Sequence, residues 1–121
     1  MNTKLFDVIH EEQSDRHVIY VKGELDLASA EQFRNIAEPL ANDKTKTLVI
    51  YLKDLTYIDS TGIGIFVSLL KRRQQLQAPV LIENIPPKIQ RLFDLTGVSR
   101  FFAAERETTK QKGQKANDER V

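Results

Sequence analysis

The 121-residue sequence predicts a single α/β domain in which a small mixed β-sheet carries helices mainly on one face. Short apolar and β-branched runs alternate with segments whose apolar residues recur every three or four positions, which is typical of strands alternating with amphipathic helices. The first two strand-like runs are joined by a short polar linker, whereas the later ones are separated by helices, so a hairpin precedes parallel crossovers. The predicted order is β-β-α-β-α-β-α-β.

The N-terminal half supplies the hairpin, the first helix and the central strand. Extended apolar segments on either side of the polar stretch 12–15 predict an antiparallel hairpin. The first helix is expected to begin near Ser29, which fits a capping box with Gln32 and is followed by apolar residues at helical spacing. Residues 47–52 are the most continuous β-branched and apolar run, and they predict a central strand covered on both faces.

The C-terminal half alternates helices with a short strand. A helix over residues 60–76 is predicted from its inward apolar stripe and its basic C-terminal end. Residues 80–82 predict a strand, and the Pro86-Pro87 pair opens a third helix that Gly97 ends.

The last part of the chain changes character. Phe101 and Phe102 are expected to form a final edge strand, which closes a domain spanning residues 1–102. From residue 103 to residue 121 apolar residues almost vanish, which predicts a charged and flexible tail.

Composition limits the classes of partner and chemistry. With 18 basic and 17 acidic side chains the net charge is +1, so nothing in the charge balance favours nucleic acid or an anionic membrane as partner. The absence of cysteine excludes disulfides and thiol catalysis. No apolar run suits a signal peptide or a membrane span, so we expect a cytoplasmic location.

The sequence Tyr-Ile-Asp-Ser-Thr-Gly-Ile-Gly at positions 57–64 joins a buried strand to the helix that follows. A serine at a helix N-terminus either caps the N–H groups of the first turn or is a modification site, where a phosphate adds about −1.5 to −2 charges. A glycine within a helix costs roughly 0.5–1 kcal/mol relative to alanine. The backbone at Gly62 and Gly64 is therefore expected to be approached closely by something outside the chain.

An enzymatic role for this joint is disfavoured. Ser60 lacks the first glycine of a Gly-x-Ser-x-Gly nucleophile elbow, and His10 and His17 are expected on the surface of the hairpin strands. The histidines and carboxylates show no metal-ligand spacing, and two glycines alone are a weak nucleotide-binding signal.

An exposed recognition edge is the remaining interpretation. Asp59, Ser60 and Thr61 follow a strand, and Asp26 closes another strand that is expected to reach the same edge. Local sequence alone favours helix capping over recognition for the first group, and a turn role is an equal alternative for Asp26.

Three blocks of sequence carry a family resemblance: residues 23–26, 52–64 and 91–97. In this order and spacing they resemble the anti-sigma factor antagonists of the STAS domain family, and the general-stress sigma-B type looks nearest. The resemblance implies a STAS-like fold over the body of the chain, with no catalytic residue, no metal and no cofactor.

The resemblance also implies partner switching. The unphosphorylated protein binds an anti-sigma factor that is also a serine kinase, which frees an alternative sigma factor. The kinase uses ATP to phosphorylate the serine of the Asp-Ser motif, here Ser60, with Thr61 as a lesser candidate, and a PP2C-type phosphatase reverses the step. The residues expected to contact the partner are Glu24, Asp26, Asp59, Thr61, Gly62, Ile63 and Gly64.

Two alternatives stay open. A STAS scaffold subunit of a larger stress-signalling complex would form a stable oligomer. An enzyme or nucleotide binder would show turnover or nucleotide affinity as the purified chain.

Overall fold

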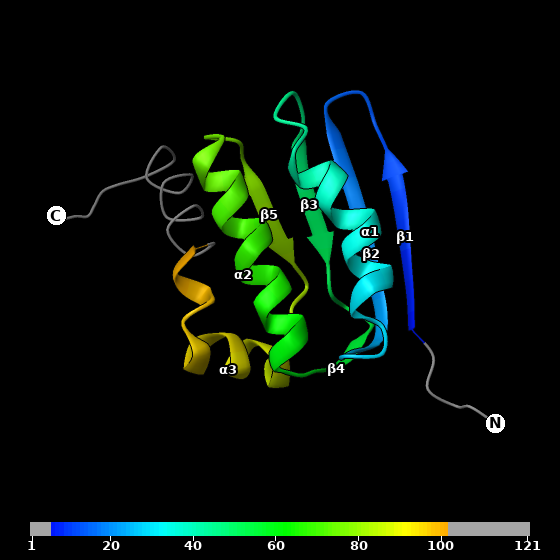
Figure 1. The fold of residues 1–121 in the computed structure, drawn as a ribbon, viewed down its shortest axis with the longest axis vertical. Coiled ribbons are helices and arrows are strands. Elements are labelled where there is room, and N and C mark those ends of the chain that lie inside the picture. The colour runs from blue at the N-terminus through cyan, green and yellow to red at the C-terminus, as the bar shows by residue number, and fades with distance from the viewer. Residues whose placement is uncertain (1–5, 102–121) are drawn as a thin grey trace, which may run out of the picture.

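The computed structural model describes residues 6–101, which form a five-stranded sheet with helices on one face (Figure 1). The prediction of a mixed α/β domain is confirmed. The elements in chain order are β1 (Phe6–Glu12), β2 (Arg16–Leu25), α1 (Ala30–Ala41), β3 (Thr47–Tyr51), β4 (Leu55–Ile58), α2 (Ser60–Gln75), β5 (Val80–Glu83) and α3 (Pro87–Thr96).

The long strand β2 organises the sheet. The strand order is β1-β2-β3-β5, and β4 pairs with β2 beyond the end of β3. β1 is antiparallel to β2, as the hairpin prediction requires, whereas β3 and β4 both run parallel to β2. The first half of β2, from Arg16 to Tyr20, pairs with β3, and its last residues, Gly23 to Leu25, pair with β4. Consequently the end of β2 lies beside the start of α2.

Two elements differ from the predicted order. Strand β4 was not predicted, because its residues are buried at both ends and exposed in the middle, which gives neither an alternating pattern nor a continuous apolar run. It pairs with β2 only after a register shift at Gly23. The final strand expected at Phe101 and Phe102 is wrong at Phe101, which is helical, and Phe102 lies outside the described residues. Gly97 ends α3 with a left-handed φ of 86°, as predicted, and the chain then turns so that Phe101 packs against the core.

The core lies between the sheet and the helices. Phe33, Phe66 and Phe93, one from each helix, are fully buried. Their ring centroids are 5.4 Å apart for Phe33 and Phe66 and 5.5 Å apart for Phe66 and Phe93, which are favourable aromatic separations. The central position of β3 is confirmed, and its residues Leu48 to Ile50 are buried. This packing holds α2 rigidly across the sheet.

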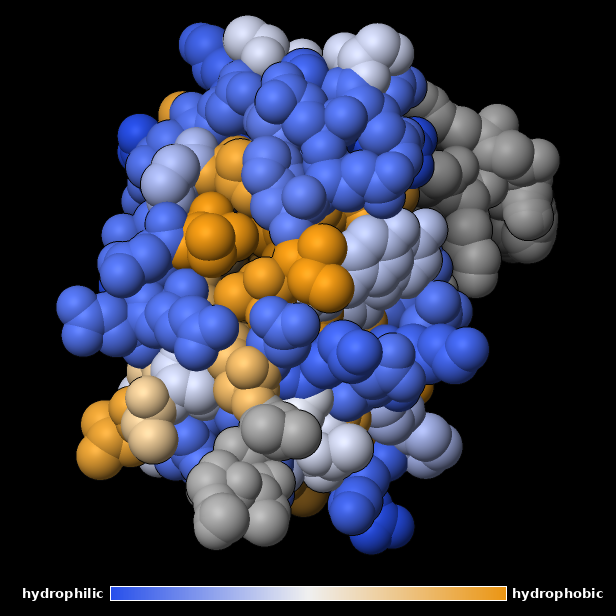
Figure 2. Space-filling model, turned by 90° about the vertical axis from the view of Figure 1, so that its right-hand side faces the viewer, coloured by the Kyte–Doolittle hydropathy of each residue, from blue (hydrophilic) through white to orange (hydrophobic). Residues whose placement is uncertain are grey.

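The edge strand β1 keeps part of its apolar surface uncovered. Figure 2 shows apolar side chains gathered on the side of the molecule that carries β1, and Ile9 on that strand is 46 % exposed. The same strand bears Asp7, Glu11 and Glu12, and charged side chains on an edge strand oppose pairing with another chain.

The end of the sheet opposite to α3 is closed by buried polar groups. His17 is only 4 % exposed, so its expected surface position is wrong. Its Nε2 lies 2.8 Å from Asp43 Oδ2 and its Nδ1 lies 3.0 Å from His10 Nε2. Hydrogen bonds from Thr45 and then from His17 hold the pKa of Asp43 well below its usual range. A histidine is buried here because both ring nitrogens have partners.

The fully buried Arg73 of α2 lies at the same end. Its guanidinium donates to five backbone carbonyl oxygens, which belong to Leu40, Ala41, Asp43, Lys46 and Pro79. A charged group is tolerated in the interior when such acceptors replace water. Arg73 therefore ties the end of α2 to the loop between α1 and β3.

The described residues contain neither a membrane-spanning helix nor a metal-binding cluster. Within residues 6–101 no helix is both long and apolar enough to cross a membrane. The same residues contain no group of three or more histidine, aspartate or glutamate side chains suited to holding a metal ion.

Candidate functional site

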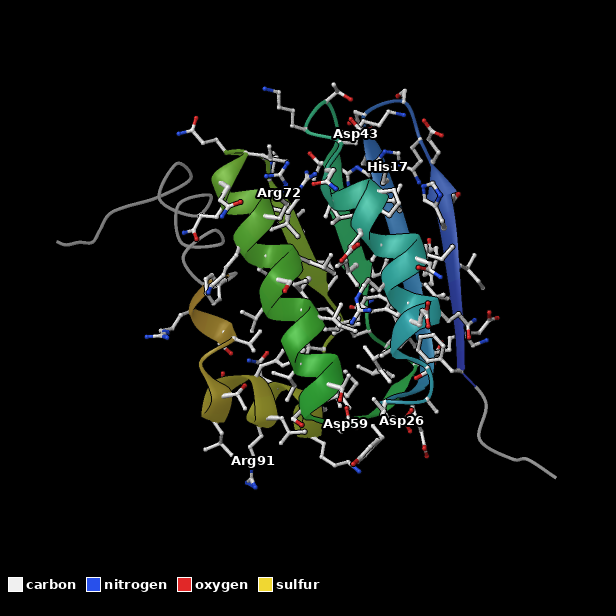
Figure 3. All side chains as sticks on the ribbon, viewed as in Figure 1. His17, Asp26, Asp43, Asp59, Arg72 and Arg91 are labelled. Atoms are coloured by element: carbon white, nitrogen blue, oxygen red, sulfur yellow. The ribbon has the colours of Figure 1, made fainter. Side chains whose placement is uncertain are left out.

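The candidate site lies where β2 and β4 end and α2 begins. Leu25 and Ile58 are register partners, and the N–H of Asp59 donates to the carbonyl of Leu25 at 3.2 Å. Figure 3 shows Asp26 and Asp59 at the same end of the molecule, away from His17 and Asp43. The expectation that Asp26 reaches the edge of Asp59 is confirmed. We call this surface, formed by residues 24–27 and 57–64, the docking edge.

Asp59 caps α2. It precedes the helix in an extended conformation, and its carboxylate accepts a hydrogen bond from the N–H of Gly62 at 3.1 Å. An acidic N-cap both satisfies a free donor and complements the positive end of the helix dipole. The capping interpretation is therefore right for Asp59.

Ser60 is not the cap. It is the first residue of α2 and is exposed, and within residues 6–101 neither its hydroxyl nor that of Thr61 makes a hydrogen bond. Thr61 is half-buried, whereas Ser60 is exposed. Because Asp59 already supplies the cap, the Ser60 side chain has no structural task at this position.

The two glycines of the motif have different environments. Gly62 is buried, and a Cβ there would lie 2.7 Å from Ile58 Cγ1 and 2.8 Å from the Leu25 carbonyl oxygen. The close approach at Gly62 is thus internal, which corrects the expectation that something outside the chain comes close to it. Gly64 is exposed, and a Cβ there would meet nothing within 4 Å. The two glycines need separate explanations.

Asp26 closes a tight turn between β2 and α1. Its Oδ1 accepts from the N–H of Ala28 at 3.0 Å and from that of Ser29 at 3.2 Å. The Ser29 hydroxyl accepts from the N–H of Asp26 at 3.0 Å and donates to the Glu24 carbonyl at 2.7 Å. The turn role considered for Asp26 is confirmed.

The capping box predicted at Ser29 and Gln32 is wrong. Ser29 occupies the N-cap position of α1, but its side chain makes no capping hydrogen bond. The preceding turn already engages the hydroxyl, so it is not directed at the helix.

The docking edge combines partly buried carboxylates with exposed apolar side chains. Glu24, Asp26 and Asp59 are all half-buried, and the half-buried Ile63 packs against the core. Leu27 is 76 % exposed and Tyr57, the register partner of Glu24, is 48 % exposed. Leu27 was not among the residues predicted for this edge; the available signal was a leucine inside a polar turn, two positions before Ser29.

Chemically, this edge is suited to recognition and to modification. It offers the exposed Ser60 at the positive end of α2, with a hydroxyl that makes no hydrogen bond within residues 6–101 and with carboxylates on the same edge. It contains no histidine or cysteine to activate a nucleophile, and a metal-binding cluster is absent from residues 6–101 as a whole.

Comparisons with known proteins agree with this fold. The family model described as "STAS domain" matches residues 8–116, so the match runs past residue 102. The anti-sigma-B factor antagonist of Staphylococcus aureus (strain NCTC 8325 / PS 47) is 33 % identical over 86 residues, which cover 71 % of this chain and 80 % of that protein.

Solved structures show the same architecture. An anti-sigma factor antagonist from Mycobacterium paratuberculosis superposes with a TM-score of 0.68 at 22 % identity, covering 79 % of this chain and 81 % of that one. The structure of SpoIIAA, an anti-sigma factor antagonist, has been solved in its unphosphorylated and its phosphorylated form. The unphosphorylated structure gives a TM-score of 0.65, covering 80 % of this chain and 84 % of that one, at 20 % identity. The phosphorylated Bacillus structure gives 0.63, covering 80 % and 87 %, also at 20 % identity.

Proposed function

The chain belongs to the STAS domain family, and on this premise we propose that it is an anti-sigma factor antagonist switched by phosphorylation of Ser60. In its unmodified form it binds an anti-sigma factor through the docking edge, and the bound sigma factor is released. The protein is a regulator without catalytic activity of its own, acting in the cytoplasm, where sigma factors meet RNA polymerase. The name of the Staphylococcus aureus relative supports this role.

The modifying partners are two enzymes of opposite effect. The anti-sigma factor acts as a serine kinase: the Ser60 oxygen attacks the γ-phosphorus of ATP, an O–P bond forms, ADP leaves, and the hydroxyl proton passes to a base of the kinase. A PP2C-type phosphatase hydrolyses the ester and restores the hydroxyl. The existence of SpoIIAA structures in both phosphorylated and unphosphorylated forms supports such a cycle.

The observation that carries the proposal is the free hydroxyl of Ser60. It is exposed at the first position of α2, while the neighbouring Asp59 supplies the cap. Phosphorylation therefore breaks no hydrogen bond among residues 6–101. The added phosphate lies at the positive end of the helix dipole, where an anion is stabilised by typically 0.3–1 kcal/mol.

The same phosphate opposes binding. It adds about −1.5 to −2 charges next to Asp59 and on the edge that carries Glu24 and Asp26. Turning a 99:1 preference for the bound state into 1:99 requires about 5.5 kcal/mol. Steric exclusion together with the cost of burying a doubly charged phosphate in a desolvated interface reaches that scale. The switch needs no refolding of the domain.

The test is phosphorylation by the anti-sigma factor encoded in the same genome. The protein is incubated with that factor and ATP, and the modified residue is located by mass spectrometry. We expect one phosphate on Ser60, none on the Ser60→Ala variant and unchanged incorporation on Thr61→Ala. Ser60→Ala is also expected to keep its affinity for the anti-sigma factor. A phosphate on another residue, or equal affinity of the phosphorylated and unmodified forms, would refute the proposal.

A further inference from the structure

We propose that Leu27 is an apolar anchor that enters a pocket of the anti-sigma factor, and that Asp26 and Ser29 hold it in position, an inference that rests on the proposed function. The partner surface that fits this arrangement is an apolar pocket beside basic side chains. The basic groups face the carboxylates of the docking edge, and the pocket takes the leucine.

The exposure of Leu27 is the first observation. With 76 % of its surface accessible, its side chain contributes little to the folded state. Isolated apolar side chains are common on protein surfaces, so exposure alone carries no function. Position and rigidity distinguish Leu27 from such residues.

The turn that carries Leu27 is rigid. Asp26 and Ser29 bracket it with reciprocal hydrogen bonds, since the Asp26 carboxylate accepts two backbone N–H groups and the Ser29 hydroxyl accepts one. The same hydroxyl donates to the Glu24 carbonyl at 2.7 Å, which anchors the turn to β2. A backbone turn held this way loses little conformational entropy on binding, which favours affinity.

Leu27 also lies close to the modification site. The carbonyl of Leu25, two residues before it, accepts the N–H of Asp59, and Ser60 follows Asp59 directly. On the neighbouring strand β4, Tyr57 is exposed opposite Glu24. Apolar groups and carboxylates thus occupy one edge, and an interface of this composition has an apolar core within a charged rim. A phosphate on Ser60 would add negative charge at this rim.

The role of Asp26 follows from the same geometry. Its Oδ1 is engaged within the turn, and Ser29, which shares the turn, is 7 % exposed and too buried to touch a partner. We therefore assign both as positioning residues that act through Leu27.

The test measures the affinity of the unphosphorylated full chain for the purified anti-sigma factor by isothermal titration calorimetry. We expect Leu27→Ala to raise Kd at least tenfold. The matched control is Leu95→Ala, because Leu95 on α3 is 75 % exposed, and we expect its Kd to stay within twofold of the wild-type value. Melting temperatures of both variants verify that the fold is intact. Equal Kd values for Leu27→Ala and the wild type, or equal losses for the two leucine variants, would overturn the inference.

A double-mutant cycle tests the positioning role. Ser29→Ala is expected to weaken binding severalfold in the wild-type background and to have no further effect in the Leu27→Ala background. Additive losses would show that Ser29 acts independently of Leu27 and would refute the assignment. If the wild-type chain itself does not bind, the proposed function fails, whereas wild-type binding that is insensitive to Leu27→Ala refutes only the anchor.

Discussion

Replacing each glycine of the motif by alanine separates packing from recognition. Gly62 and Gly64 are both in α2 and only two residues apart. A Cβ at Gly62 would come within 2.7–2.9 Å of Ile58 Cγ1, the Leu25 carbonyl oxygen and Leu25 Cγ, whereas a Cβ at Gly64 would meet nothing within 4 Å. The same substitution is therefore expected to have opposite effects on stability.

The magnitudes follow from two competing contributions. Alanine is favoured over glycine in a helix by roughly 0.5–1 kcal/mol, and at Gly64 nothing opposes this gain. At Gly62 the Leu25 carbonyl is backbone and cannot rotate away, so overpacking costs typically 1–3 kcal/mol. We expect Gly62→Ala to lower the free energy of unfolding by about 1–2 kcal/mol and Gly64→Ala to raise it by about 0.5–1 kcal/mol.

The assay is urea unfolding followed by circular dichroism, with binding to the anti-sigma factor measured on the same samples. In a domain of this size 1 kcal/mol corresponds to a change in Tm of several degrees. A Gly62→Ala variant as stable as the wild type would refute the packing explanation. If Gly64→Ala is stabilised but binds more weakly, the partner approaches the Gly64 backbone; unchanged binding would remove Gly64 from the proposed contact surface.

Three further predictions concern the cap, the buried arginine and acid stability. Asp59→Ala is expected to lower the free energy of unfolding by about 1 kcal/mol because the cap is missing, while Ser60→Ala changes it by less than about 0.5 kcal/mol. Equal losses for the two variants in urea unfolding would show that Ser60 contributes to the cap as much as Asp59 does. Arg73→Met should lose at least about 3 kcal/mol because buried carbonyls lose their donor, whereas the exposed Arg72→Met should be nearly neutral in the same assay. The pKa of Asp43 is lowered by Thr45 and then His17, so its stabilisation is full above its unfolded pKa of about 4 and is lost as the pH falls below that value. Melting curves of Asp43→Asn should therefore depend less on pH between neutral and acidic conditions, and an unchanged slope would contradict this.

Elements with a local sequence signal were predictable. The three helices lie near their predicted positions because each shows apolar residues at helical spacing, and the hairpin, β3 and β5 do so because each contains a short apolar run. Strand β4 was not predicted, since its four residues owe their strand conformation to pairing with β2, about thirty residues earlier. Its two middle residues are exposed between buried ends, so it lacks the continuous apolar run by which the equally short β5 was recognised.

The candidate site was likewise predictable only where the signal was local in the sequence. The motif at residues 57–64 and the aspartate of residues 23–26 were recognisable from residue type and spacing. Which side chain caps α2 was not, since Asp59 and Ser60 are both good capping residues and only the backbone conformation at the junction decides between them. The burial of His17 depends on Asp43, which lies 26 residues away in the sequence.

The amino-acid sequence by itself determined the class of fold, the order of most elements and the hydroxyl on which the proposed switch depends. Only the tertiary structure decided that Ser60 is free, that Gly62 faces inward and that Leu27 stands out on a rigid turn. The physical reason is the sequence separation over which each signal acts, since periodicity and turn chemistry depend on a few neighbouring residues. Burial and hydrogen-bond partners are instead set by segments that meet only when β2, β4 and α2 have packed together.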